Sequence, residues 1–267
     1  MLGLDDLVGT YFEGLLAMAL SMARVYPCAY MVPVFGFTLI RGFPRHALVL
    51  SLAIIPAGAL HGQLDLTSLG LVSWATLIFK EVVLGVLLGL VLGLPFWLFE
   101  SVGALLDNQR GALTGGQLNP ALGADATPIG HMLKEMTIVV LMTTLGFEVL
   151  LQVLWSSYTA WPALTLMPLP ADGYSGLLKL LDGTFNYLVL YSAPFVALLL
   201  LVELALALLS LYSPQLQVFV IAMPAKCLIG IAFFALYLPY LVEHMTNRLH
   251  SFSDLIPSVR ALLDQPG

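Results

Sequence analysis

Two hydrophobic stretches of this sequence each contain an adjacent lysine and glutamate. The first is IFKEVVLGVLLGL (78–90), with Lys80 and Glu81, and the second is MLKEMTIVVLM (132–142), with Lys134 and Glu135. Neighbouring residues of a helix point about 100° apart, so the two charges of a pair are not expected to face each other. Two interpretations stay open. In the first, both pairs lie at a membrane surface, where the lysine side chain extends toward water. In the second, they face a protein interior or a neighbouring subunit.

A third charge, Arg24, lies in the middle of the first hydrophobic segment, between LAMALSMA and VYPCAYMVP. Insertion of an arginine at the centre of a membrane helix costs about 3 kcal/mol, so we expect a carboxylate partner. The candidates in apolar segments are Glu100, Glu148 and Glu203. A structural ion pair within an assembly is favoured over a transport site, because the histidines are scattered along the chain and form no group with other titratable residues.

The stretch LYSPQLQVFVIAMPAK (211–226) contains the strongest local signal for irregular structure. Pro214 and Pro224 bracket a short apolar run, Gln215 and Gln217 lie near one end, and Lys226 follows the other. Proline removes a backbone donor and kinks a helix, so one straight helix is disfavoured. The stretch predicts either a kinked helical hairpin or a broken segment at a subunit contact or pore wall.

No pattern of catalytic or metal-binding residues is present. The sequence contains no HExxH, no G-x-S-x-G and no carboxylate pair at a useful spacing, and Cys28 and Cys227 both lie in apolar segments without metal-ligand spacing. Asn119-Pro120-Ala121 spells the NPA box of aquaporins but occurs once rather than twice, and we interpret it as a chance match. We therefore expect no enzyme activity, no cofactor and no metal.

The composition shows what kind of fold must position these charges. Hydrophobic residues make up 60% of the 267 residues and charged residues 10%, against about 25% charged in a soluble domain, and the mean hydropathy is +0.95. Lipid must cover part of such a chain, so it is an integral membrane protein. A net charge of −6 argues against nucleic-acid binding. The first fourteen residues contain no lysine or arginine, which argues against a cleavable signal peptide.

A membrane-spanning helix needs about 20 mostly apolar residues. By that rule the hydrophobic segments lie near 12–39, 46–61, 69–105, 130–156, 184–212 and 215–242. Prolines interrupt the first segment (Pro27 and Pro33) and the third (Pro95). We predict an all-α membrane protein with about six hydrophobic helical segments, arranged as kinked helical hairpins, of which at least one is not a simple membrane span. We expect a hydrophobic domain at 1–244 and a polar tail at 245–267, in which one or two short helices break near Pro257.

The distribution of basic residues predicts the orientation in the membrane, because cytoplasmic loops collect lysine and arginine. Arg41 and Arg45 follow the first segment and Arg110 follows the third, which fits an external N-terminus. The alternation then fails, because six full spans would place the basic tail, with Arg248 and Arg260, outside. If one late segment is incomplete, the tail is cytoplasmic, and we expect that arrangement.

Four stretches, in this order along the chain, resemble the T component of the type III secretion export apparatus, the SctT/FliR family. They are ARVYPCAYMVPVFG (23–36), FKEVVLGVLLGL (79–90), DNQRGA (107–112) and SPQLQVFVIAMPAK (213–226). Each motif is loose by itself, but the ordered set, with its Lys-Glu and Ser-Pro-Gln elements, is fairly specific and covers the chain from the first segment to the last. The last stretch favours the injectisome branch over the flagellar one.

The resemblance implies a multi-pass protein of the bacterial inner membrane and a structural, pore-forming subunit of the type III export gate. Its partners would be the R-type and S-type gate subunits, the U-type switch protein, membrane lipid and the secreted unfolded polypeptides. It also implies a spiral of helical hairpins, partly outside the bilayer. Inter-subunit or intramembrane charge contacts would come from Arg24, Lys80, Glu81, Arg110, Lys134 and Glu135. The hairpin near the pore would contain Pro214, Gln215, Gln217, Pro224 and Lys226.

Two other functions stay open on the residues alone. A secondary transporter or small-solute channel would contain inverted internal repeats and a polar site at mid-membrane; the flanks of the two Lys-Glu pairs match only in hydrophobicity. A membrane scaffold without a pore role is the other. A transporter would be stable and active alone, whereas a gate subunit would need its partners.

Overall fold

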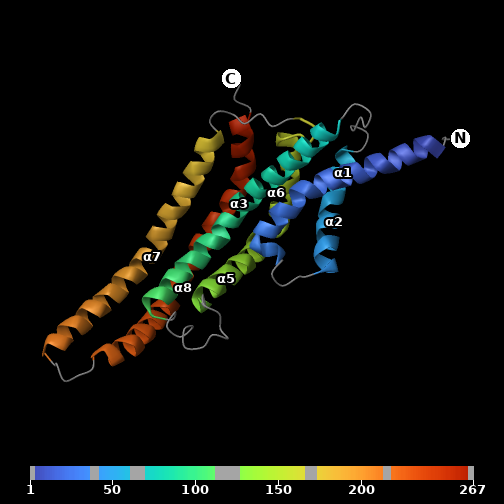
Figure 1. The fold of residues 1–267 in the computed structure, drawn as a ribbon. Coiled ribbons are helices and arrows are strands. Elements are labelled where there is room, and N and C mark those ends of the chain that lie inside the picture. The colour runs from blue at the N-terminus through green and yellow to red at the C-terminus, as the bar shows by residue number, and fades with distance from the viewer. Residues whose placement is uncertain are drawn as a thin grey trace. The chain divides into compact units, whose positions relative to one another are not determined.

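A computed structural model of the chain describes residues 4–36, 42–60, 70–111, 127–165, 173–212 and 218–263. Within these residues every regular element is a helix (Figure 1). The helices are α1 (Leu4–Met31), the short 3₁₀ helix η1 (Pro33–Phe35), α2 (Phe43–Leu60), α3 (Leu71–Gln109), α5 (Pro128–Thr144), α6 (Glu148–Ala160), α7 (Gly173–Tyr212) and α8 (Val218–Leu263). The predicted all-α class is confirmed.

Four helices are long and apolar enough to cross a membrane in the part of the chain that the structure describes. These spans are Phe43–Leu60, Val72–Gln109, Ser175–Tyr212 and Ala222–Ser251, and the interrupted pair α5 and α6 adds a fifth if it is counted as one broken span. The expected mixture of membrane spans and other helices is therefore present.

The helix boundaries differ from the predicted segments at four places. The predicted segment 130–156 is two helices, because Gly146 has a φ of +74° and its N–H bonds to the carbonyl of Leu141, which ends α5. In contrast, α1 continues through Pro27, α3 through Pro95 and α8 through Pro257. The predicted breaks at these prolines are wrong, because a helix whose other backbone bonds are kept tolerates the loss of one donor.

The chain forms two compact units. Unit 1 comprises residues 1–93, 147–176 and 251–267 and therefore contains α1, α2, α6 and the first part of α3. Unit 2 comprises residues 94–146 and 177–250, with the rest of α3, α5 and most of α7 and α8.

In unit 1, α1 lies against α3 at two glycines. A Cβ atom on Gly85 would overlap the carbonyl oxygen of Arg24, and one on Gly89 would lie 3.0 Å from the Cα of Cys28. Because neither glycine has a side chain, the backbone of α1 approaches α3 directly beside Arg24. The small apolar core nearby contains Ala17, Leu20, Ala57, Leu60, Leu77 and Ala163.

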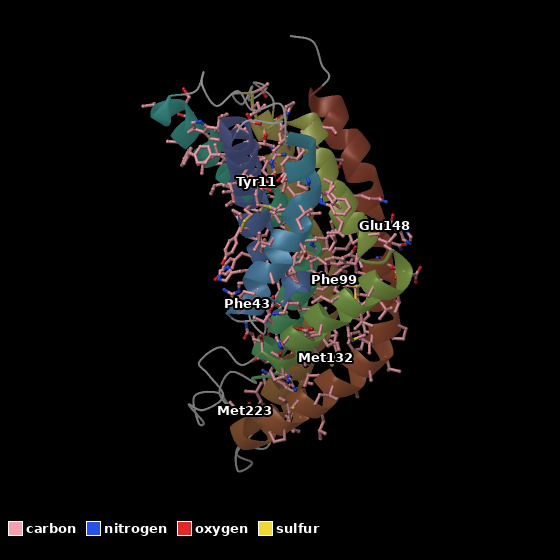
Figure 2. All side chains as sticks on the ribbon, turned by 90° about the vertical axis from the view of Figure 1, so that its right-hand side faces the viewer. Tyr11, Phe43, Phe99, Met132, Glu148 and Met223 are labelled. Atoms are coloured by element: carbon pink, nitrogen blue, oxygen red, sulfur yellow. The ribbon has the colours of Figure 1, made fainter. Side chains whose placement is uncertain are left out.

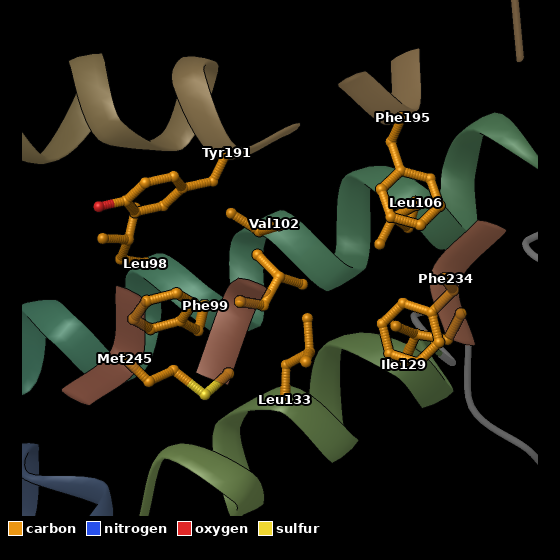
Figure 3. Packing of buried hydrophobic residues seen from close by; sticks show 11 residues of the cluster. Leu98, Phe99, Val102, Leu106, Ile129, Leu133, Tyr191, Phe195, Phe234 and Met245 are labelled. Atoms are coloured by element: carbon orange, nitrogen blue, oxygen red, sulfur yellow. The ribbon is translucent and has the colours of Figure 1, made fainter. Parts of the chain in front are cut away.

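Unit 2 is held together by a larger core rich in aromatic residues, shown in Figure 3. The ring of Phe99 on α3 stacks on Tyr191 of α7, with 5.8 Å between ring centroids. Phe195 of α7 packs against Phe234 of α8 on the same core. A Cβ on Gly103 would lie 2.6 Å from the Cα of Gly130, so α3 and α5 cross in direct backbone contact.

The helices differ in how much of their apolar surface the chain itself covers. Half of the most apolar window of α3 is buried, against 11% for α7 and 17% for α8. Large apolar side chains also stand at the surface elsewhere, including Tyr11 (72% exposed) and Phe43 (84% exposed), both labelled in Figure 2. Lipid or other proteins must cover α7 and α8, because exposure of such a large apolar surface to water is unfavourable.

Candidate functional site

Three helices of unit 1 meet at a buried ion pair. Arg24 of α1 donates from Nε to Oε2 of Glu81 on α3 at 2.6 Å and from the Nη2 atom to Oε1 at 2.9 Å. Both side chains are fully buried. The guanidinium also donates to Ser157 Oγ at 3.1 Å and to the carbonyl of Trp161 at 2.8 Å, at the end of α6. This is a bidentate, charge-assisted pair of the stronger kind.

The expected need of Arg24 for a carboxylate is met, but by a different residue from those predicted. Glu81 is the partner, so the assignment of Glu100, Glu148 or Glu203 is wrong. The pairing spans 57 positions of sequence, and helical spacing holds no information about contacts between separate helices.

Lys80 joins the same cluster. Its Nζ lies 2.9 Å from Oε1 of Glu81 and donates to the carbonyls of Pro162, Ala163 and Thr165 at 3.0, 2.8 and 2.8 Å. The expectation that Lys80 and Glu81 do not face each other is wrong, because the long lysine chain bends toward the glutamate and both side chains converge on the end of α6. Lys80 is 6% exposed, so this pair faces the protein interior.

The cluster is suited to holding helices in place. A helix ends with carbonyls that have no partner in the helix and a partial negative charge, and cations near it are favourable. Arg24 and Lys80 supply those cations to the residues that follow α6, and Glu81 neutralises one of the two positive charges. These contacts join residues of α1, α3 and α6, so the arrangement ties the three helices together.

The second Lys-Glu pair, in unit 2, is arranged differently. Lys134 of α5 donates to Oε1 of Glu100 on α3 at 2.7 Å, and the two side chains are 19% and 32% exposed. Glu135 is 52% exposed and lies 3.9 Å from His131, one turn earlier on α5. One member of this pair therefore binds a neighbouring helix, and the other stands at the surface of the chain.

Arg110 forms part of a third charged group in unit 2. The buried carboxylate of Asp107 accepts from Arg110 Nε at 2.9 Å and from its Nη2 atom at 2.5 Å. The same carboxylate accepts the backbone N–H groups of Ile129 and Gly130 at 2.8 and 3.3 Å, so it caps the start of α5. The sequence reasoning missed Asp107, although its i, i+3 spacing to Arg110 is a usual ion-pair signal.

The predicted hairpin region is described in part. Lys226 of α8 binds Oε1 of Glu203 on α7 at 3.0 Å. Pro224 lies exposed inside α8, which begins at Val218. Pro214, Gln215 and Gln217 lie outside the described residues.

Arg248, which was predicted to be a basic residue of the cytoplasmic tail, packs inside unit 2. Its guanidinium lies 3.2 Å from the ring centroid of Tyr187, and its Nε donates to the hydroxyl of Tyr191 at 3.3 Å. Cation–π contact and a hydrogen bond therefore hold it against α7. In the described part of the chain, no group of three or more histidine, cysteine, aspartate or glutamate residues could hold a metal ion.

Comparison with known proteins agrees with the resemblance found in the sequence. The family model described as bacterial export proteins, family 1, matches residues 15–252. Yop proteins translocation protein T of Yersinia pestis is 31% identical over 258 residues, which cover 94% of this chain and 97% of the relative. Surface presentation of antigens protein SpaR of Salmonella typhimurium is 31% identical over 220 residues, covering 82% and 81%.

A flagellar relative extends the comparison to the other branch. Flagellar biosynthetic protein FliR of Bacillus subtilis is 26% identical over 251 residues, covering 92% of this chain and 94% of the relative. The family model and the relatives match nearly the whole chain, with its buried charges and apolar helices. The chain therefore belongs to the bacterial export proteins, family 1, the family of the type III secretion T component and its flagellar counterpart.

Proposed function

We propose that this chain is a structural, pore-forming subunit of the type III secretion export gate. Together with R-type and S-type partners it conducts unfolded polypeptides across the bacterial inner membrane, and the U-type switch protein binds the assembled gate. Membership of the family and the names of the relatives, which are translocation, secretion-apparatus and flagellar biosynthetic proteins, support this function.

The observation that carries the proposal is the length of the exposed apolar surface on α7. Exposed large apolar side chains are spread along α7 from Leu178 (45% exposed) to Tyr212 (85% exposed), with the exposed polar residues Lys179, Asp182 and Asn186 among the first of them. The two ends are about 51 Å apart at about 1.5 Å per residue. The hydrocarbon core of a bilayer is about 30 Å thick. Even a tilt of about 40° accommodates only about 39 Å of helix inside it.

The remainder of that surface needs another cover. The helix α8, with 46 residues, is about 69 Å long by the same measure and leaves most of its apolar window exposed as well. Apolar surface that extends beyond the bilayer is stable only against protein. A chain of this kind depends on partner subunits, as a gate component does, whereas a transporter that works alone would have no apolar surface beyond the part that lipid covers.

The charged residues take two roles in this proposal. Arg24, Lys80, Glu81 and Arg110, with most of their charge partners inside the chain, position the helices that the neighbouring subunits contact. Glu135, exposed on α5, makes the direct inter-subunit contact, beside the Lys134 ion pair. An exposed carboxylate at membrane depth is stable when a cation or a polar group of a neighbour meets it.

The orientation is part of the proposal. The basic residues after the first and third segments are cytoplasmic, and the C-terminus after α8 is cytoplasmic too. Reporter fusions test it: a fluorescent protein fused after Gly267 is expected to fluoresce, and a periplasmic phosphatase at the same place is expected to stay inactive. The opposite pattern would contradict a cytoplasmic C-terminus.

The function itself is tested by deletion and reconstitution. A strain from which this gene is deleted is expected to secrete no type III substrates. Secretion is expected to return when a plasmid supplies the gene. Affinity purification of the chain is expected to recover R-type and S-type subunits in a defined complex. A chain that purifies alone as a stable protein with solute-transport activity, and whose deletion leaves secretion intact, would identify a transporter or channel instead.

A further inference from the structure

A cavity of about 610 Å³ opens in unit 2 between the end of α3, the end of α7 and the start of α8. Its lining combines charged and polar groups (Arg110, Glu203, Ser210, Lys226) with small or apolar ones (Ala207, Met223). This volume and mixture are typical of a small-molecule site. None of the roles assigned to these residues above requires an open space between the helices.

The charged groups in the cavity have donors to spare. The ammonium of Lys226 has three N–H groups, of which one meets Glu203 at 3.0 Å. The guanidinium of Arg110 has five; two meet Asp107, and a third points to the sulfur of Cys227 at 3.8 Å, a weak contact. Both cations are only slightly exposed, at 18% and 13%, so an anion that reaches them is bound in a largely desolvated place.

The charges around the cavity sum to zero. Arg110 and Lys226 are balanced by Glu203 and the buried Asp107, and Glu203 alone among these carboxylates is open to the outside, at 56% exposure. A ligand that complements this pattern has a negative group for the two cations and a positive group for Glu203. It is a zwitterion, rather than a simple anion.

The cavity lies where three apolar spans stop. The span of α3 ends at Gln109, that of α7 ends at Tyr212 and that of α8 begins at Ala222. Arg110 follows the end of the α3 span, whereas Lys226 lies four residues and Glu203 nine residues inside the ends of the α8 and α7 spans. Because α7 and α8 are longer than the hydrocarbon core of a bilayer requires, these groups are placed within reach of lipid headgroups. Along α7 beside the cavity, Leu200 and Leu204 are 53% and 57% exposed, which gives acyl chains an apolar surface to follow.

We propose that this cavity binds the headgroup of a bilayer phospholipid with a primary ammonium, that is, a phosphoethanolamine lipid. The phosphodiester lies between Lys226 and Arg110, the ammonium donates to Glu203, and the acyl chains lie along α7. The bound lipid fills the space between the α7–α8 pair and α3. The inference stands independently of the pore-forming role, since it needs only the membrane location.

The test uses the full chain in complex with its companion subunits, purified in mild detergent and reconstituted in nanodiscs of phosphatidylethanolamine, phosphatidylglycerol or phosphatidylcholine. Native mass spectrometry counts the lipids that survive stepwise delipidation. We expect one retained phosphatidylethanolamine for each copy of this chain. Retention of phosphatidylglycerol or phosphatidylcholine is expected to be at least five-fold lower, because the first has no ammonium and the second has no N–H for Glu203.

Variants place the lipid in this cavity. Glu203→Gln keeps the size of the side chain and removes its charge, Lys226→Gln removes the ammonium, and both are expected to lower retention at least five-fold. Ala207→Phe fills the cavity and is expected to abolish retention. Ala205→Phe, on an exposed position of α7 outside the lining, is the matched control and is expected to retain the lipid. Equal retention of the three lipids, unchanged retention in the glutamine variants, or displacement by inorganic phosphate alone would overturn the proposal.

Discussion

Replacement of Glu81 by alanine removes the only carboxylate at the junction of α1, α3 and α6 in the described structure. Arg24 is fully buried and Lys80 is 6% exposed, so the change leaves two cations facing each other without a counter-ion. Loss of one partner of a buried ion pair costs about 3–5 kcal/mol. That is a large share of a total stability of about 5–15 kcal/mol, and it corresponds to a melting temperature lowered by roughly 6–20 °C at about 2–4 °C per kcal/mol.

The buried thiol of Cys28 makes the measurement possible. This residue is 1% exposed and lies one turn after Arg24, so a thiol-reactive fluorophore reports the opening of the junction once Cys227 has been changed to serine. The melting temperature of Glu81→Ala in detergent is compared with that of Glu148→Gln, an exposed glutamate of the same unit that is expected to change stability by less than about 0.5 kcal/mol.

A double variant separates the ion pair from the packing. Arg24→Met with Glu81→Leu keeps apolar volume and leaves one buried cation, Lys80, where Glu81→Ala leaves two, so it is expected to lose less stability than Glu81→Ala alone. A melting temperature of Glu81→Ala within 1 °C of the parent chain would refute the reasoning, since it would mean that the two cations need no counter-ion.

Thermal unfolding in detergent tests two further residues, and hydrogen exchange tests a third. Gly103→Ala places a Cβ 2.6 Å from the backbone of Gly130, so α3 and α5 must separate, at a cost of about 1–3 kcal/mol of stability. The control is Gly58→Ala, whose Cβ has no atom within 4 Å and which is expected to gain up to about 1 kcal/mol of stability. Asp107→Asn weakens the cap of α5 and is expected to speed hydrogen exchange of the first α5 amides, which mass spectrometry measures; unchanged exchange would contradict the capping role. Lys134→Gln breaks a partly exposed pair and is expected to cost no more than about 1 kcal/mol, so a larger loss would show a buried role.

The helical class could be predicted because long apolar runs leave a membrane chain few alternatives. In lipid every backbone polar group needs an internal partner, so such runs become helices. The same reasoning could not find the end of α5 at Gly146, since hydrophobicity continues across that residue and only its positive φ breaks the helix. At Pro95 and Pro257 the sequence predicted breaks that the helices do not have, because a proline disfavours a helix without always ending it.

The candidate site was predicted as a set of residues and not as a set of contacts. Arg24, Lys80 and Glu81 could be identified because a charge inside an apolar segment is energetically costly and so requires a polar or charged partner. Their partners depend on which helices pack together. Four of these partners are backbone carbonyls between Trp161 and Thr165, a group that every residue carries. No pattern of side chains along the sequence marks those carbonyls.

The central claim is that partner subunits cover the parts of the apolar faces of α7 and α8 that extend beyond the bilayer. The most direct test places a photo-reactive amino acid at Val189 of α7, which is 66% exposed in the chain alone, in cells with the complete apparatus. We predict a covalent adduct with an R-type or S-type subunit that disappears when the companion genes are deleted, while a probe at the buried Leu199 forms none. If Val189 and other exposed positions of α7 form adducts with lipid alone in both strains, the chain is not covered by partners and the account is wrong.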